Sequence, residues 1–191
     1  MSNDILLTLH AVRLLGFADT QPVAERFSQD QETVEAQLIV AGMHGFVSRN
    51  TFGDSSGWSL SELGREENER LLRAELERTD GGATVVEEVH QEFTRPNATV
   101  VSACTAVRMN GGDAGRARED LKQALTSWAP LETRLTSILP RFSGYSRRLD
   151  NALSQAASDP SWITATDRDS FHRVWFELHE DLIATLGLRR G

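Results

Sequence analysis

Hydrophobic residues repeat at helical spacing near the beginning of the chain. Ile5, Leu6, Leu9, Val12 and Leu15 form one stripe with a period of about 3.6 residues. This stripe predicts a first helix over residues 4–15. A shorter second helix is predicted over residues 20–27, because a turn-forming stretch follows at residues 28–30.

A third helix is predicted directly after that turn. Asp30 is well placed to cap it, since its short carboxylate can accept a hydrogen bond from a free amide of the first helical turn. Val34 and Leu38 are expected to face inward, together with Val40 or Ala41. Glycines at positions 42 and 45 then end the helix.

The pattern changes after residue 45 to two short extended runs, 46–52 and 58–60, around the Gly-rich stretch 53–57. This arrangement predicts a β-hairpin. A polar helix over residues 61–78 follows, and Thr79-Asp80-Gly81-Gly82 breaks it. We therefore expect a domain boundary near residue 80.

Every later hydrophobic stripe has helical spacing. We expect one helix to be interrupted at Pro96 and another to be bent at Pro130. For the last helix, over residues 167–186, the expected outward-facing residues are Arg173, Glu177, Glu180 and Asp181. The predicted fold is mainly α: a unit over residues 1–80 with a small hairpin, then a bundle of four to five helices over residues 81–191.

The order helix, helix, turn, helix, hairpin, helix is that of a winged helix. Residues 23–47, followed by Gly57-Trp58-Ser59-Leu60-Ser61-Glu62-Leu63-Gly64-Arg65, resemble winged-helix transcriptional regulators of the MarR type. The resemblance covers about the first 80 residues. The run Trp175-Phe-Glu-Leu-His-Glu-Asp-Leu-Ile-Ala-Thr-Leu-Gly187 is similar to the end of helical domains on uncharacterised actinobacterial regulators. The resemblance implies a transcriptional regulator that binds double-stranded DNA as a homodimer, with the helical domain supplying the dimer contacts.

The DNA-binding residues that this resemblance implies are Gln31, Thr33 and Gln37 on the third helix and Arg49 on the hairpin. The basic residues usual on that helix are missing here. Residues 1–80 hold seven Arg and 14 acidic residues, which gives a net charge of −7 out of −8 for the chain. Asp30 and Glu32 suit a helix start, but Glu35 is expected to face phosphates and weaken binding. The alternative is a protein-interaction module on a winged-helix scaffold that has lost DNA binding.

Residues of the predicted bundle suggest a small-molecule effector site. The candidate ligands of an anionic effector are Arg141, Tyr145, Arg148, His172 and His179. Asp169-Ser-Phe-His172 also resembles the metal-binding helical domain of GntR-type regulators, although their Asp and His are usually four positions apart rather than three. We expect no metal ion, because the more common role of such histidines is packing inside a bundle.

Several other functions are not expected. The chain has no phosphate-binding Gly loop, no nucleophile elbow and no cysteine pair at metal spacing, so we expect neither an enzyme nor a cofactor. Its single cysteine, Cys104, is expected to be buried and inert. No apolar run reaches the length of a membrane span, about 20 residues. We therefore expect a cytoplasmic protein without membrane contact.

Overall fold

The computed structural model describes residues 3–53, 55–110 and 113–188. They form two compact units: residues up to 78 together with 187–188, and residues 79–186. The chain is mainly helical, with one small antiparallel hairpin, as the hydrophobic pattern predicts. No helix of the described part is both long and apolar enough to cross a membrane.

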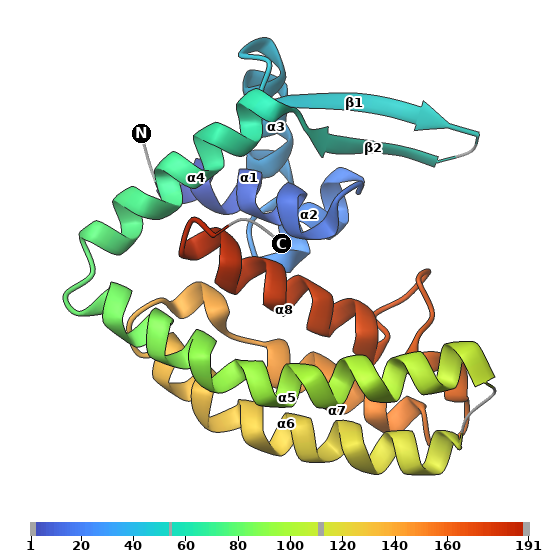
Figure 1. The fold of residues 1–191 in the computed structure, drawn as a ribbon. Coiled ribbons are helices and arrows are strands. Elements are labelled where there is room, and N and C mark those ends of the chain that lie inside the picture. The colour runs from blue at the N-terminus through green and yellow to red at the C-terminus, as the bar shows by residue number, and fades with distance from the viewer. Residues whose placement is uncertain (1–2, 54, 111–112, 189–191) are drawn as a thin grey trace. The chain divides into compact units, whose positions relative to one another are not determined.

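The described residues of the first unit form four helices and the hairpin (Figure 1). Their bounds are α1 Asn3–Leu15, α2 Thr20–Arg26, α3 Gln31–Met43, β1 Val47–Phe52, β2 Ser55–Leu60 and α4 Glu62–Glu77. Helix α1 lies at the centre, because it contacts α2, α3, α4 and β2. The core residues of this unit are Leu9, Ala11, Val12, Val23, Ala24, Val34, Leu38, Ala41, Val47 and Trp58.

Short polar side chains begin three of these helices. Asp19 accepts a hydrogen bond from the Thr20 amide before α2, Asp30 accepts one from the Thr33 amide at α3, and the Ser61 hydroxyl accepts one from Gly64 at α4. The bond from Thr33 also lowers the pKa of the Asp30 carboxyl group. The expected cap of α3 is therefore present.

The hairpin pairs Val47 with Leu60 at its base and Phe52 with Ser55 near its turn. Strand β2 also contacts the segment between α1 and α2. The Ala18 amide donates to the Trp58 carbonyl at 3.2 Å, and the Trp58 amide donates to the Ala18 carbonyl at 2.8 Å. These two bonds fasten the hairpin to the rest of the unit.

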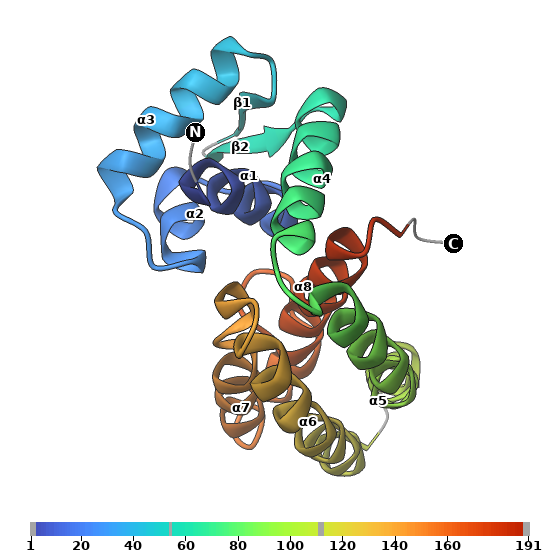
Figure 2. The ribbon, with the colours of Figure 1, turned by 90° about the vertical axis from the view of Figure 1, so that its left-hand side faces the viewer.

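The second unit consists of α5 Gly82–Asn110, α6 Ala114–Thr136, the 3₁₀ helix η1 Pro140–Phe142, α7 Tyr145–Gln155, the 3₁₀ helix η2 Pro160–Ile163 and α8 Phe171–Thr185. Helices α5 and α6 lie side by side along most of their lengths (Figures 1 and 2). Helix α7 contacts α6 and α8, and α8 in turn contacts α5. The four helices thus enclose a common core.

Aromatic rings fill that core. Phe93 stacks on Trp175 with ring centroids 5.0 Å apart, and it lies nearly perpendicular to Trp128 with centroids 5.9 Å apart. Phe171 also stacks on Trp175, with ring centroids 5.7 Å apart. The Trp175 indole also donates to the Asn97 side chain at 3.0 Å, so its polar atom is satisfied.

Helix α5 runs through Pro96, so the predicted interruption there is wrong. Proline removes one backbone hydrogen bond, but Phe93 and Val100 on either side are both buried on the same face. Packing of that face keeps the helix continuous, because tertiary contacts supply most helical stability in proteins.

Helix α8 also differs from expectation. Glu177 and Asp181, predicted to face outward, are 1% and 0% exposed. They lie one turn apart and point toward arginines of η1 and α7. Burial of two carboxylates is compatible with the fold because both are paired with cations.

Candidate functional site

The surface of α3 has an inner and an outer face. Val34, Leu38 and Ala41 are buried against the core. On the opposite side Ile39 and Val40 are each 51% exposed and Met43 is 81% exposed. The sequence predicts that either Val40 or Ala41 faces inward, and in the structure the inward residue is Ala41. Exposed large apolar side chains on successive turns of one helix are a feature of binding surfaces.

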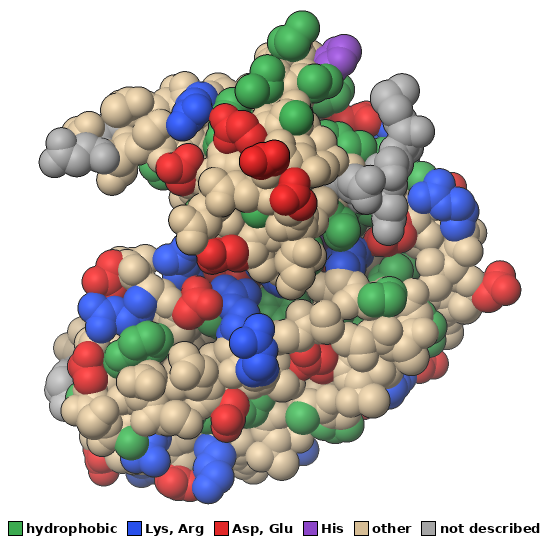
Figure 3. All heavy atoms as spheres, turned by 180° about the vertical axis from the view of Figure 1, so that it is seen from behind, with side chains coloured by type: hydrophobic (Ala, Val, Ile, Leu, Met, Phe, Trp, Pro, Cys, Tyr) green, Lys and Arg blue, Asp and Glu red, His purple; other side chains and the backbone are tan. Residues whose placement is uncertain are grey.

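A fourth exposed hydrophobic residue comes from α4. Leu63 is 51% exposed and lies next to Gly45, in the turn that follows α3. The turn and the start of α4 are held together, because the Ser61 hydroxyl donates to the Gly45 carbonyl at 2.6 Å. We call the surface formed by Ile39, Val40, Met43 and Leu63 the α3–α4 face. Figure 3 shows hydrophobic side chains gathered around a histidine at this end of the unit, with acidic side chains beside them.

The residues expected to read DNA do not share one face. Gln31 and Thr33 are exposed at the start of α3, but the Thr33 hydroxyl already donates to Asp30 at 2.8 Å. Gln37 is turned toward α1, where its amide oxygen accepts a hydrogen bond from the Thr8 hydroxyl. The structure therefore does not place Gln37 beside the exposed Gln31 and Thr33 side chains. The physical reason is its position three residues after Val34, which puts it on the inner side of the helix.

Arg49 of β1 is held by the protein itself. Its guanidinium nitrogens lie 3.7 Å from an Asp19 carboxylate oxygen and 3.6 Å from one of Glu35. The same group lies 5.3 Å from the centroid of a Trp58 ring. Two carboxylates therefore already lie beside its positive charge.

Glu35 has a structural role that explains an acidic residue in this helix. Besides its pairing with Arg49, it accepts a hydrogen bond from the Thr20 hydroxyl. Thr20 in turn accepts one from the Trp58 indole at 3.2 Å. Glu35 thus links α3 to α2 and to the hairpin, so its carboxylate is not a free charge on the helix surface.

The arginines and the tyrosine proposed for an effector are bound to carboxylates of the second unit. Arg141 pairs with Asp181 and donates to the Thr185 hydroxyl at 2.8 Å, and the Tyr145 hydroxyl donates to Asp181 at 2.9 Å. Arg148 pairs with Asp169 and Glu177 at 2.8 and 2.7 Å. Burial acts to lower the pKa of Arg148, but the hydrogen bond to Asp169 and the charge of Glu177 outweigh it and raise that pKa. Internal carboxylates thus occupy the positions that an anionic effector needs.

The two histidines of the predicted effector set lie elsewhere. The His179 ring packs 5.5 Å from Phe93 and 6.4 Å from His90, both on α5. Burial, with a smaller effect of Arg108 on α5, lowers the pKa of His172. Arg141, Tyr145 and Arg148 face carboxylates rather than α5, so the structure does not bring the five predicted effector residues together.

Two other chemical candidates in this unit have simple explanations. Asp169 is paired with Arg148, and no group of three His, Cys, Asp or Glu side chains among the described residues could hold a metal ion. Cys104 is buried, and burial raises the pKa of its thiol to about 12, with a smaller opposing effect of Arg108. A thiol with that pKa carries almost no reactive thiolate at neutral pH.

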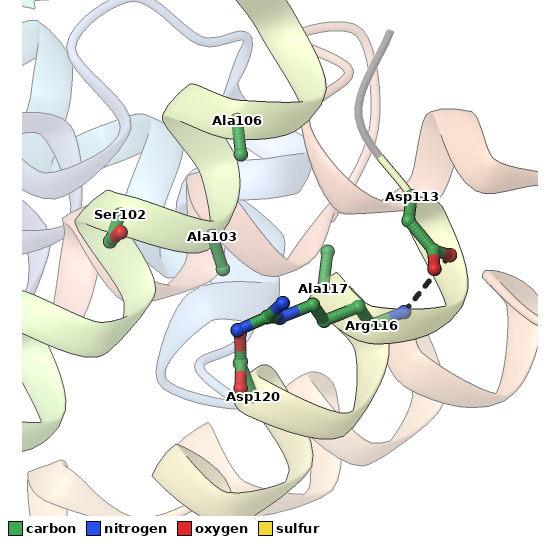
Figure 4. Close-up of a pocket in the computed structure, with 7 residues that line it drawn as sticks. All are labelled: Ser102, Ala103, Ala106, Asp113, Arg116, Ala117 and Asp120. Carbon is green, nitrogen blue, oxygen red and sulfur yellow. Dashed lines mark hydrogen bonds between the residues drawn. The ribbon is translucent and has the colours of Figure 1, made fainter. Parts of the chain in front are cut away.

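A hollow of about 320 Å³ lies between α5 and α6 (Figure 4). Its lining residues are Ser102, Ala103, Ala106, Asp113, Arg116, Ala117 and Asp120. The Arg116 side chain points toward Asp120, and Asp113 accepts hydrogen bonds from the first amides of α6. The hollow is lined by small apolar side chains, and its Asp113 carboxylate is already bonded to α6. It therefore offers few groups that could select a ligand.

Comparisons with known protein families, with curated proteins and with solved structures found no match for this chain. The chemistry of the described surface therefore carries the functional inference. Sequence reasoning missed the α3–α4 face, although a signal for it exists. Ala36, Ile39, Val40 and Met43 repeat at intervals of three and four, which forms a second apolar stripe opposite Val34 and Leu38.

Proposed function

We propose that the first unit is a protein-docking module on a winged-helix scaffold. The observation that carries the proposal is the outward face of α3, where Ile39, Val40 and Met43 are exposed in place of basic or hydrogen-bonding side chains. In a winged helix this is the surface that would enter a DNA groove. Apolar side chains there form few favourable contacts with phosphates or base edges, whereas their burial against another protein is favourable.

The charges around this face support the same function. Arg49, the basic residue expected to grip DNA from the hairpin, is paired with Asp19 and Glu35. A net charge of −7 over residues 1–80 opposes the approach of a polyanion. A protein partner avoids this repulsion.

The test is a selection of displayed protein fragments on the full-length chain. We expect the selected fragments to lose at least about tenfold in affinity with Met43→Asp, because it places a charge in the centre of the contact. Val101→Asp is the matched control: Val101 is 56% exposed on α5 and the same charge is added in the second unit. Fragments that bind both variants equally would place docking elsewhere.

Met43 is so exposed that its substitution should change the free energy of unfolding by no more than about 0.5 kcal/mol.

A second candidate is a DNA-binding transcriptional regulator that acts as a homodimer. The observation that favours it is the exposure of Gln31 and Thr33 at the start of α3, where a winged helix places base contacts. This function needs two subunits, so light scattering of the free protein must give a dimer. It also needs selection from random DNA to enrich a sequence whose binding is lost with Gln31→Ala.

Glu35→Gln separates the two candidates further. It removes one of the two carboxylates that hold Arg49, while the matched variant Glu32→Gln leaves both in place. For a DNA-binding protein, Glu35→Gln should raise the affinity for any duplex about fivefold, the effect of an interaction of about 1 kcal/mol. For a protein-docking module we expect neither variant to bind DNA at low salt, as measured by fluorescence anisotropy of a labelled duplex.

A further inference from the structure

We infer that the partner of the α3–α4 face is a segment of another protein that carries apolar side chains flanked by lysine and arginine. This inference rests on the docking function proposed above and adds the chemistry of the partner. It follows from the combination of an apolar centre with an acidic surround.

The centre of the face offers contacts to apolar side chains. Met43 is its most exposed member at 81%, with Ile39 and Val40 on the preceding turn and Leu63 beyond the turn after α3. Methionine has a flexible and polarisable side chain, so it adapts to the shape of an incoming residue. A partner must therefore supply apolar side chains to cover this area.

The surround is acidic, and much of its charge is not neutralised. Glu32 is exposed on the same side of α3, two turns before Ile39, and Glu62 and Glu66 are exposed beside Leu63 on α4. Within the described ranges, no basic side chain forms an ion pair with these three carboxylates. Arg65 is exposed on the same turn of α4 and contributes one positive charge against them.

A second copy of the chain is a poor occupant for such a surface. In a twofold contact the same face lies on both partners, so Glu32, Glu62 and Glu66 would meet or approach their own copies. Like charges across an interface disfavour association, whereas opposite charges raise both affinity and association rate. A basic segment satisfies the acidic surround and the apolar centre together.

Two synthetic amphipathic peptides test the inference on the full-length protein. Both carry the same stripe of leucines at helical spacing, with lysine at the remaining positions of one and glutamate at those of the other. We expect the lysine peptide alone to bind, measured by fluorescence anisotropy. Its affinity should fall about tenfold when salt is raised from about 50 mM to about 500 mM, because exposed charges are screened.

Variants separate specific docking from general attraction to an acidic protein. Met43→Asp adds a negative charge, so general attraction would strengthen binding of the lysine peptide, whereas docking on the face predicts at least about tenfold weaker binding. Val101→Asp adds the same charge in the second unit and should leave the affinity unchanged. The double variant Glu62→Gln with Glu66→Gln should weaken binding and reduce its salt dependence.

The remaining outcomes overturn the inference in distinguishable ways. If both peptides bind and both respond to Met43→Asp, docking stands and the basic partner is wrong. If light scattering shows a dimer that Met43→Asp dissociates, a second copy of the chain occupies the face. Docking then stands, and the basic partner is again wrong. If neither peptide binds, or if binding of the lysine peptide ignores Met43→Asp, the proposed docking function fails as well.

Discussion

Replacing Gly64 by alanine should prevent the first unit from folding. A Cβ atom at this position would lie 1.9 Å from the Phe46 carbonyl oxygen, 2.7 Å from its carbon and 2.6 Å from a Leu60 methyl group. The Phe46 carbonyl has little freedom to move, because it accepts a hydrogen bond from the Ser61 amide at 3.0 Å. We expect a loss of more than about 4 kcal/mol, comparable to the net stability of a small domain. Urea unfolding followed by circular dichroism measures it.

Gly42→Ala is the matched control in the same unit. The nearest atoms to its added methyl group would be the Val47 carbonyl oxygen at 3.8 Å and the Trp58 ring at 3.9 Å, which are ordinary contacts. Gly42 lies inside α3, where alanine is favoured over glycine, so this variant should gain about 0.5–1 kcal/mol. A loss below 1 kcal/mol for Gly64→Ala would show that α4 does not begin against the Phe46 carbonyl as described.

Asp181→Ala should be the most damaging charge substitution in the second unit. Asp181 and Arg141 have side chains that are 0% and 3% exposed, and Asp181 also accepts a hydrogen bond from Tyr145. Removing the carboxylate takes away the ion-pair partner of a buried guanidinium and the 2.9 Å acceptor of a buried hydroxyl. Loss of one partner of a buried ion pair costs about 3–5 kcal/mol, which urea unfolding of the full chain would register.

An exposed ion pair provides the comparison. Arg134 contacts Glu88 and Glu92 at the surface, and its side chain is 38% exposed. Arg134→Ala should leave the midpoint of urea unfolding almost unchanged, since solvent screens both partners. If Asp181→Ala were equally mild, water would have to reach Arg141, and its burial in the structure would be incorrect.

The mainly helical fold and the hairpin could be predicted because they depend on local patterns. The stripe from Val34 to Leu38 and the cap at Asp30 are set by residues a few positions apart, and the structure contains both. The pairing of Glu35 with Arg49 could not be predicted in the same way. Those residues lie on different elements and meet only when β1 packs against α3.

The placement of the candidate effector residues could not be predicted for a related reason. Arginine composition indicates anion binding, but it does not reveal whether the anion is a ligand or a carboxylate of the same chain. Glu177 and Asp181 belong to a helix in which most residues are buried, and both carboxylates are buried as well. Acidic residues on such a helix are a usable signal, because a buried charge requires a partner elsewhere in the fold.

The reciprocal hydrogen bonds between Ala18 and Trp58 should make the amide hydrogens of these two residues exchange with solvent together. Each of the two amides donates to the other residue's carbonyl, so neither hydrogen can exchange with solvent while the hairpin stays on the segment between α1 and α2. Both amides must therefore become accessible in the same opening event and exchange at rates governed by one equilibrium. The deuterium uptake of these two residues reports how often the hairpin, with Arg49 on its outer strand, detaches from the helices.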